Sequence, residues 1–342
     1  MSVKVHLTTF IFFCFFVCMN SMADDRKLSA ASKSGIRVPA EWEAHAATWM
    51  QWPDRYDAEM RPAFADIIDV IQAYEPVHLL TRSAPEKAQA KRYLSRQGVS
   101  DTNIIWHIVP LDNAWMRDNG PVYVTDGVRT WIQNWGFDAW GGNFGEEVGY
   151  HYDDRIPTYV GEQINMTVVD YQDYVLERGN LEFNGAGILI LNWDCQDDRN
   201  PGMTQAEHEA ILKKAFGVTK IIWAYGHHPE DGTTGHIDGA ARFIDRDTLV
   251  IADTGMTTEQ NLAIAAEEAG LEVILYPGDP NWLVGNGFVV AMGEGDSDSD
   301  AELKLQLRSF FPDRDIYLVD ASSIAASGGG IHCVTNDQPA LP

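Results

Sequence analysis

The segment TQAEHEAILKKAFGVTKIIWA, residues 204–224, contains the structural unit that decides the fold. Thr204 is a candidate helix N-cap, and Glu207 completes a capping box three residues later. Gly217 ends the predicted helix, and the apolar stretch KIIWA from Lys220 predicts a strand. The segment therefore predicts an amphipathic helix, a tight break and a buried strand, in that order.

The same succession of helix, break and strand recurs along the chain. Four further units span residues 63–81, 84–109, 257–277 and 300–320. This alternation predicts an α/β fold and excludes the all-α and all-β classes. Five similar units favour one domain built as a closed ring with pseudo-fivefold symmetry over an ordinary doubly wound sheet. Since no glycine-rich phosphate loop follows a predicted strand, the sequence gives no support to nucleotide binding.

The composition is that of an acidic globular protein. The chain has 342 residues, 45% of them hydrophobic, so it can bury a sizeable core. Lys and Arg number 25 against 50 Asp and Glu, which gives a formal net charge of −25. This balance argues against a nucleic-acid or anionic membrane partner and suits a cationic substrate. Solubility explains the same acidity equally well, and the oligomeric state, a homo-oligomer included, stays open.

The N-terminal residues have the pattern of a targeting signal. Lys4 precedes the apolar run 7–19, which is short for a bilayer span, and small residues follow at 21–23. We expect a signal peptide over 1–23 with cleavage after Ala23, and export to the periplasm or the medium. The mature chain, 24–342, would then have no membrane segment; an uncleaved anchor is the alternative.

Cysteine usage leaves two candidates in the mature chain. Cys14 and Cys18 lie in the signal segment, so Cys195 and Cys333 remain. An exported protein could join them in a disulfide. The alternative is that one of them is a reactive thiol.

Four short motifs carry polar residues of catalytic types. They are WMRDNGP (115–121), ERGN (177–180), GHIDG (235–239) and GGGIHCVT (328–335). On a strand, His236 and Asp238 would point to the same side. Three glycines allow a close approach of the backbone, and a following strand would present Cys333. Singly, each motif is also typical of a turn or of a buried core.

Other chemistries fit parts of this set. His227, His228, His236 and Asp238 could form a zinc site, although no second motif has ligand spacing. A Cys–His protease or amidase is open as well, because spacing alone does not exclude it. The core motifs imply no metal, and we expect no cofactor.

Taken together, the motifs resemble the agmatine deiminase and bacterial peptidylarginine deiminase family of the pentein superfamily. Further matching stretches cover most of the mature chain: VPAEWEAH (38–45), TWM (48–50), WP (52–53), WGFDAWGG (135–142) and RNP (199–201). The resemblance implies a five-bladed α/β propeller. It also implies an amidine hydrolase that converts a guanidinium to a ureido group and releases ammonia through a covalent amidino-cysteine intermediate.

The resemblance assigns roles that suit this reaction. Cys333 is the nucleophile, since a thiolate can attack the weakly electrophilic guanidinium carbon. Asp118 and Asp238 match the carboxylates that grip the planar cation. His236 is the general acid and base, and Glu177 orients it and favours its protonated form. The cationic substrate itself would favour the thiolate.

The resemblance also suggests substrate contacts and shows departures. Trp115 offers an aromatic wall, with core packing as the alternative. Asn286 lines up with an asparagine near the family's pocket. Arg178 replaces the first glycine of the family's E-G-G motif, and Gly330 stands where a common spelling has Asn. These departures leave the substrate open.

Two guanidino substrates and one non-catalytic function remain as alternatives. Agmatine needs an acidic or aromatic far pocket, and the acidic stretch 131–155 favours it. Its product would belong to polyamine metabolism and putrescine synthesis. The expected export favours the other substrate, the arginine residues of proteins, and a secreted peptidylarginine deiminase that converts them to citrulline. A periplasmic receptor for guanidino compounds or polyamines is the alternative of another class, although binding alone needs no thiol.

Overall fold

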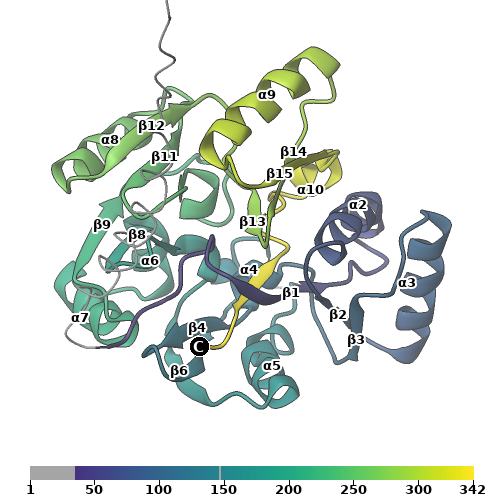
Figure 1. The fold of residues 1–342 in the computed structure, drawn as a ribbon. Helices are drawn as coiled ribbons and strands as arrows, with labels where there is room; N and C mark the ends of the chain where they lie inside the picture. The colour runs from purple at the N-terminus through teal and green to yellow at the C-terminus, as the bar shows by residue number, and fades with distance from the viewer. Residues whose placement is uncertain (1–34, 146–147) are drawn as a thin grey trace, which may run out of the picture.

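The computed structural model describes residues 35–145 and 148–342, and its strands form five separate small sheets (Figure 1). The first sheet has the order β16 (Asn336–Pro339), β1 (His45–Gln51), β2 (Val77–Thr81), β3 (Ile104–Ile108). The second and third are β4 (Val122–Thr125), β5 (Thr130–Gly136), β6 (Val168–Val175) and β7 (Glu182–Phe183), β8 (Ile188–Asn192), β9 (Lys220–Ala224). The fourth and fifth are β10 (Ala241–Phe243), β11 (Thr248–Ala252), β12 (Glu272–Tyr276) and β13 (Leu283–Gly285), β14 (Phe288–Met292), β15 (Asp315–Val319).

The five sheets share one pairing pattern. In each, the first strand pairs antiparallel with the second, and the second pairs parallel with the third. In the first sheet, the first strand is β16 from the end of the chain, and β3 adds a second parallel pair. The first and the last of the described strands, β1 and β16, therefore pair in one sheet.

Helices make the parallel crossovers, since parallel strands need a long connection. They are α2 (Arg61–Gln72), α3 (Ala84–Arg96), α5 (Ile156–Ile164), α6 (Trp193–Arg199), α7 (Gln205–Phe216), α8 (Thr257–Glu268) and α9 (Ser297–Phe310). Two shorter helices, α4 (Met116–Asn119) and α10 (Ser322–Ala326), lie in other connections. In Figure 1, α3, α5, α7, α8 and α9 lie at the periphery, while β1, β13 and α4 lie near the middle.

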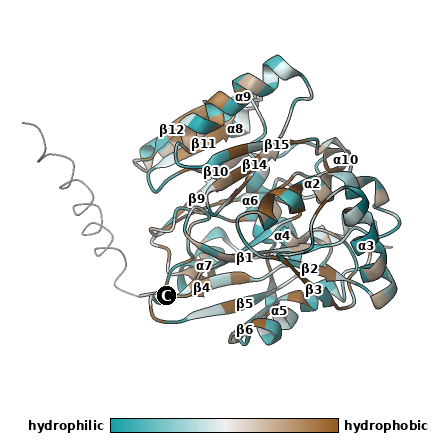
Figure 2. Cartoon of the chain, turned by 45° about the vertical axis from the view of Figure 1, so that its right-hand side comes forward, coloured by the Kyte–Doolittle hydropathy of each residue, from teal (hydrophilic) through white to brown (hydrophobic). Residues whose placement is uncertain are grey.

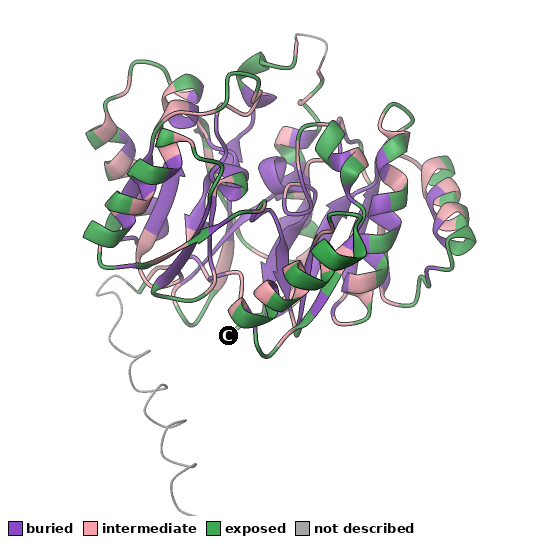
Figure 3. Ribbon diagram, turned by 90° about the horizontal axis from the view of Figure 1, so that it is seen from above, coloured by how far each residue is buried: buried purple, intermediate pink, exposed green. Residues whose placement is uncertain are grey.

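The strands carry the core, and the outer helices face solvent with one side. Buried residues concentrate on the strands in Figure 3, and Figure 2 shows hydrophilic residues on the outer helix α3. Helix α2, for example, buries Phe64, Ile68 and Ile71 against the strands of the first and fifth sheets. Each crossover helix thus covers an apolar sheet face, as expected where helices and strands share one core.

The α/β class and the five predicted helix–strand units are confirmed. The capping box of Thr204 and Glu207 is present, and Gly217 ends α7 in a left-handed conformation. The units do not, however, correspond one to one with the sheets. The units 63–81 and 84–109 belong to the same sheet, and the pair α5 and β6 was not predicted. Strand β6 has the sequence VVDYQDYV and is largely solvent-accessible, so it lacks the apolar signal of the others.

The expected signal peptide, 1–23, lies outside the described residues. Within the described residues, no helix is both long and apolar enough to span a bilayer.

Candidate active site

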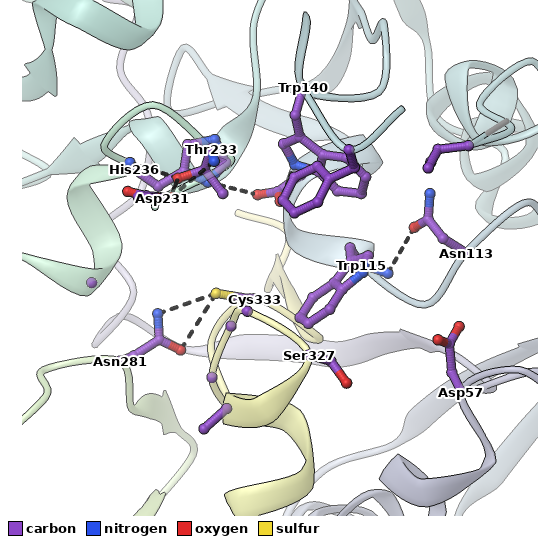
Figure 4. A pocket seen from close by; sticks show the side chains of 18 of the residues that line it. Asp57, Asn113, Trp115, Trp140, Asp231, Thr233, His236, Asn281, Ser327 and Cys333 are labelled. Atoms are coloured by element: carbon purple, nitrogen blue, oxygen red, sulfur yellow. Dashed lines mark hydrogen bonds and ion pairs between the residues drawn. The ribbon is translucent and has the colours of Figure 1, made fainter. Parts of the chain in front are cut away.

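One cavity of about 670 Å³ gathers most of the predicted site residues (Figure 4). Asp118, His236, Asp238 and Cys333 all line it, and so does Trp115. Cys333 and Cys195 are both free thiols, so the predicted alternative of a disulfide is wrong. The structure thus brings the sulfur, the imidazole and both aspartates to one space.

The site is built from the turns that lead into the first strand of each sheet. Asp118 in α4 precedes β4, and Glu177 precedes β7 directly before the 3-10 turn η5 (Arg178–Asn180). The other sheets contribute one turn each: His236 and Asp238 before β10, Asn281 before β13 and Cys333 before β16. The repeated entry turn therefore supplies a polar side chain from every sheet.

Two local predictions are wrong at these turns. His236 and Asp238 are not on a strand: His236 caps the 3-10 turn η6 (Ile237–Gly239), which contains Asp238. Cys333 is likewise in a turn, three residues before β16. The turns still direct all three side chains to the cavity, because a tight 3-10 turn does not alternate its side chains as a strand does.

The sulfur of Cys333 lies among carboxylate oxygens and two donors, the backbone N–H of Gly330 and the side-chain amide of Asn281. Its Sγ lies 3.7 Å from Asp238 Oδ2 and 3.2 Å from the Nδ2 of Asn281. Burial, together with the charges of Asp238 and Asp118, raises the pKa of the Cys333 thiol well above its usual value. The thiol form therefore dominates until a cation enters the cavity.

Glycines before Cys333 allow this close packing. A Cβ on Gly329 would come within 2.5 Å of the Trp115 ring and 3.3 Å of the Cys333 Cβ. A Cβ on Gly330 would clash with the side-chain oxygen of Asn281. The predicted close approach of the backbone at this glycine run is thus confirmed.

His236 lies between two carboxylates. Its Nε2 is 2.6 Å from Glu177 Oε2, and its Nδ1 is 3.4 Å from Asp118 Oδ1. Burial alone would lower the pKa of His236, but the charges of Asp118 and Glu177 outweigh burial and raise it well above the usual value. Gly179 makes the approach to Asp118 possible, because a Cβ there would come within 2.5 Å of both side chains. His236 therefore carries a proton at neutral pH.

Glu177 is held by α6 as well as by His236. Arg199 donates from Nε to Oε1 at 2.7 Å and from Nη2 to Oε2 at 3.2 Å. The Cys195 sulfur, one helical turn earlier on α6, lies 3.7 Å from Oε2. Burial would raise the pKa of Glu177, but His236 and Arg199 lower it instead. Glu177 is therefore an ionised and fixed partner for the imidazole.

The ligand atoms of Glu177, Cys195 and His236 lie close enough together to surround a metal ion. The guanidinium of Arg199 already occupies the Glu177 carboxylate, and burial raises the pKa of the Cys195 thiol to about 11. A second cation would therefore meet repulsion and an unionised thiol. We interpret the three side chains as a hydrogen-bonded cluster.

The two aspartates face the cavity with unequal partners. Asp118 Oδ2 accepts a hydrogen bond from Trp140 Nε1 at 2.9 Å, whereas its buried Oδ1 has no hydrogen bond in the described structure. Burial and the nearby charges of Asp238 and Glu177 raise the pKa of Asp118 to about 6, although His236 opposes them. Asp238 Oδ2 lies 2.7 Å from His332 Nδ1, and this contact lowers the Asp238 pKa against the effect of burial. A planar cation that donates to both aspartates would satisfy the unfilled oxygen of Asp118.

A buried ionic frame holds the floor of the site. His332 joins Asp238 to Glu41, with Nε2 at 2.7 Å from Glu41 Oε2, and Arg242 donates to the same carboxylate at 2.8 Å. Arg178 forms an ion pair with Asp337 at 2.7 Å. The Arg178 side chain therefore pairs with Asp337 in this frame, and it does not displace the contact between Glu177 and His236.

Asn286 is not a substrate contact, so that prediction is wrong. Its side chain accepts from the backbone N–H of His45 and donates to the His45 carbonyl, both at 2.9 Å. Its backbone N–H donates to Glu75. Asn286 thus fastens β1 to the turn after β13, and it is Asn281 that lines the cavity and lies beside the sulfur.

Several residues of the site were given no role by sequence reasoning. Trp140, Arg199, His332 and Glu41 all lie in stretches that carried the family resemblance, so that signal could have found them. Asn281 lies in no such stretch. Its proximity to Cys333 arises from a contact over 52 positions in the sequence, which no local pattern contains.

The alternative zinc set is not assembled. His227 pairs with Asp194 at 3.2 Å, and His228 accepts from the backbone N–H of Glu230. Neither lines the cavity that holds His236 and Asp238.

Comparison with known proteins points to one family. The sequence pattern of Porphyromonas-type peptidyl-arginine deiminase matches residues 37–273 and 279–339. An agmatine deiminase of Stutzerimonas stutzeri (strain A1501) is 30% identical, over 91% of this chain and 98% of its own length. One of Pseudomonas aeruginosa (strain LESB58) is 29% identical with the same coverage. The solved agmatine deiminase of Enterococcus faecalis has the same fold, with a TM-score of 0.81 and 23% identity over 92% of this chain and 99% of that one.

Proposed function

The chain belongs to the Porphyromonas-type peptidyl-arginine deiminase family and is an amidine hydrolase, and we propose that its substrate is agmatine. The reaction would convert agmatine and water to N-carbamoylputrescine and ammonia. The acidic cavity carries this proposal. Its described lining includes seven aspartates and neither lysine nor arginine.

The aspartates are distributed in a way that suits a substrate charged at both ends. Asp118 and Asp238 lie beside Cys333, where the guanidinium would bind. In Figure 4 the Trp115 indole lies between Cys333 and Asp57, which lines the other part of the cavity. The Asp57 carboxylate has no hydrogen-bond or ion-pair partner in the described structure, and burial with the charges of Asp54 and Glu59 raises its pKa. An ammonium group at that end would relieve the repulsion among these carboxylates.

The proposed chemistry begins at the Cys333 sulfur. The thiolate attacks the guanidinium carbon while Asp118 and Asp238 hold the planar cation in place. The carbon–nitrogen bond then breaks as His236 gives its proton to the departing nitrogen, so ammonia leaves and an amidino group stays on the sulfur.

Water completes the cycle. His236, now neutral, takes a proton from the water that attacks the amidino carbon. The carbon–sulfur bond breaks, the electron pair returns to sulfur, and the ureido product leaves. Glu177 supports His236 in both steps by stabilising its protonated form.

A substrate comparison tests this proposal. The purified protein would be incubated with agmatine, free arginine and an arginine-containing peptide, and ureido product and ammonia would be measured. We expect agmatine to have the highest kcat/KM. A higher kcat/KM for the peptide would support a peptidylarginine deiminase. Tight agmatine binding with no product from any compound would support a receptor.

We propose two further properties, of which family membership favours only the first. The five sheets would form the blades of a ring, a proposal supported by their common pairing pattern and by the β16–β1 pair. A crystal structure in which five equal rotations superpose the units would test it.

The protein would also be exported, which the N-terminal charge, apolar run and small residues support. N-terminal sequencing after fractionation would test this, with Asp24 expected first.

A further inference from the structure

A side-chain amide outside the predicted catalytic set lies within hydrogen-bond reach of the Cys333 sulfur. Asn281 precedes β13, and its Nδ2 lies 3.2 Å from Cys333 Sγ (Figure 4). Its Oδ1 is farther away, at 3.6 Å. The residue is mostly buried and lines the cavity.

The orientation of this amide follows from its hydrogen bonds. The backbone N–H of His332 donates to Asn281 Oδ1 at 2.9 Å and also contacts the Asn281 carbonyl oxygen at 3.2 Å. Because Oδ1 already accepts from a backbone donor, the opposite assignment would place an N–H against an N–H. The NH₂ group therefore faces the sulfur.

The chain leaves room for this arrangement at one glycine. A Cβ on Gly330 would clash with Asn281 Oδ1 and lie 3.0 Å from the Asn281 Cβ. Gly330 is also the position at which this sequence departs from the common family spelling. Any side chain there would push the amide away from its place beside Cys333.

We propose that Asn281 is a further catalytic residue, whose side-chain amide donates to the Cys333 sulfur and stabilises its thiolate, with Gly330 as the positioning residue that admits it. The proposal rests on the assignment of Cys333 as nucleophile in the proposed function. In the free enzyme the thiol proton passes to water, and the electron pair stays on sulfur.

The electrostatic surroundings make such a donor necessary. Asp238 and Asp118 both oppose a negative sulfur, and His236 already faces two carboxylates. Two groups act in the other direction on the Cys333 pKa: the backbone N–H of Gly330 and the amide of Asn281. A neutral amide stabilises the thiolate without repelling the substrate cation, which a lysine or arginine at this place would do.

Alkylation of the free enzyme by iodoacetamide tests the proposal without any substrate. The rate would be followed against pH in the wild-type protein and in Asn281→Ala, with mass spectrometry to confirm modification of Cys333 and not of the buried Cys195. We expect Asn281→Ala to slow alkylation about tenfold at pH 8, which equals a rise of about one unit in the apparent thiol pKa. Asn281→Asp, which keeps Oδ1 but adds a charge, should slow it further.

A cycle of variants separates this role from a purely structural one. Gly330→Ala should slow alkylation as Asn281→Ala does, and the double variant should be no slower than either single one. Ser327→Ala is the matched control, because Ser327 lines the same cavity and its hydroxyl donates to the Ser323 carbonyl. Its alkylation profile should equal that of the wild type. Thermal unfolding of each variant would confirm that it is folded.

The outcomes are distinct. An unchanged profile in folded Asn281→Ala, or additive losses in the double variant, would overturn the proposal. If Asn281→Ala does not fold, an unchanged profile in Gly330→Ala overturns it instead. A slowed alkylation in a protein that deiminates none of the tested guanidino compounds would support the role of Asn281 while refuting the proposed substrate.

Discussion

Glu177 Oε2 lies 2.6 Å from His236 Nε2, with both side chains buried and Arg199 held against the other oxygen of the same carboxylate. This pair joins the third sheet to the fourth across the site. The carboxylate keeps the imidazole protonated, and the arginine keeps the carboxylate ionised. The proton that His236 would give to the leaving nitrogen is thus maintained by a chain of two ion pairs.

Replacement of this carboxylate should change the pH dependence of turnover. In the proposed mechanism His236 acts as an acid, so activity should fall as pH rises through its raised pKa. Glu177→Gln removes a charge that raises this pKa, and the alkaline fall in kcat should move to lower pH, with kcat at pH 8 reduced about 10- to 100-fold. Glu268→Gln, at an exposed position of α8, is the control. An alkaline limb at the wild-type position in Glu177→Gln would contradict the assignment.

The two thiols should differ sharply. Cys333→Ala should abolish turnover, since no other group can form the amidino intermediate, while agmatine binding by calorimetry survives. Cys195→Ala should keep more than about a tenth of kcat, because its thiol is buried and neutral, contacts Glu177 and His236 from the side of α6, and does not line the cavity. Near wild-type turnover in Cys333→Ala would refute the nucleophile assignment.

Asp118 should contribute to both binding and alignment. Asp118→Asn removes a charge beside the guanidinium site, so KM should rise and kcat should fall, each about tenfold or more. Trp140→Phe, which removes the indole N–H bonded to Asp118, should give a smaller loss in the same direction. The measurement is steady-state kinetics with agmatine, and an unchanged kcat/KM in Asp118→Asn would place the substrate elsewhere.

The far end of the cavity should decide between substrates. Asp57→Asn removes a carboxylate that would face the ammonium of agmatine, and KM for agmatine should rise about 3- to 10-fold, as expected for a partly exposed ion pair. An arginine peptide carries no such ammonium there, so its kcat/KM should change little. An equal loss of kcat/KM for both compounds would show that Asp57 does not bind the ammonium group of agmatine.

Acid should destabilise the first sheet through a histidine pair. His78 Nδ1 lies 2.9 Å from His107 Nε2, and both rings stack near Trp49. Burial, together with the neighbouring His107 for His78 and Lys87 for His107, lowers the pKa of each histidine to about 4. Because the unfolded histidines bind protons at higher pH, stability should be lost as pH falls from about 6.5 toward 4.

Thermal unfolding would measure this effect. The decrease in Tm over that range should be a few degrees smaller in His78→Asn than in the wild-type protein. His228→Asn, at an exposed position, serves as control and should follow the wild-type curve. A Tm decrease of equal size in all three proteins would show that the pair does not titrate.

The elements were predictable where the local signal was strong. Helix α7 has a capping box and a terminal glycine, and both were readable in the sequence. Five helix–strand units were predicted and five sheets are present, but the units do not correspond one to one with the sheets. Two units share the first sheet, while β6 alternates polar residues at an exposed edge and gave no apolar run. Sheet membership depends on pairing between distant segments, which local periodicity does not encode.

The site was predictable as a set of residues but not as a geometry. Cys333, His236, Asp118 and Asp238 do meet in one cavity. Their placement on strands was wrong, because the backbone that presents them turns tightly before each strand begins. Asn281 and Asn286 lie close together in the sequence, and no local pattern distinguishes their roles. Tertiary packing places Asn281 beside the Cys333 sulfur and Asn286 against His45.

The pairing of β16 with β1 has a consequence for the timing of synthesis. Ribosomes make a chain from its N-terminus, so Cys333 and β16 are added after every strand of the other four sheets. Four sheets can be complete while the proposed nucleophile is not yet translated. A polypeptide released before residue 333 would therefore lack the proposed nucleophile, even with the strands of the other four sheets already made.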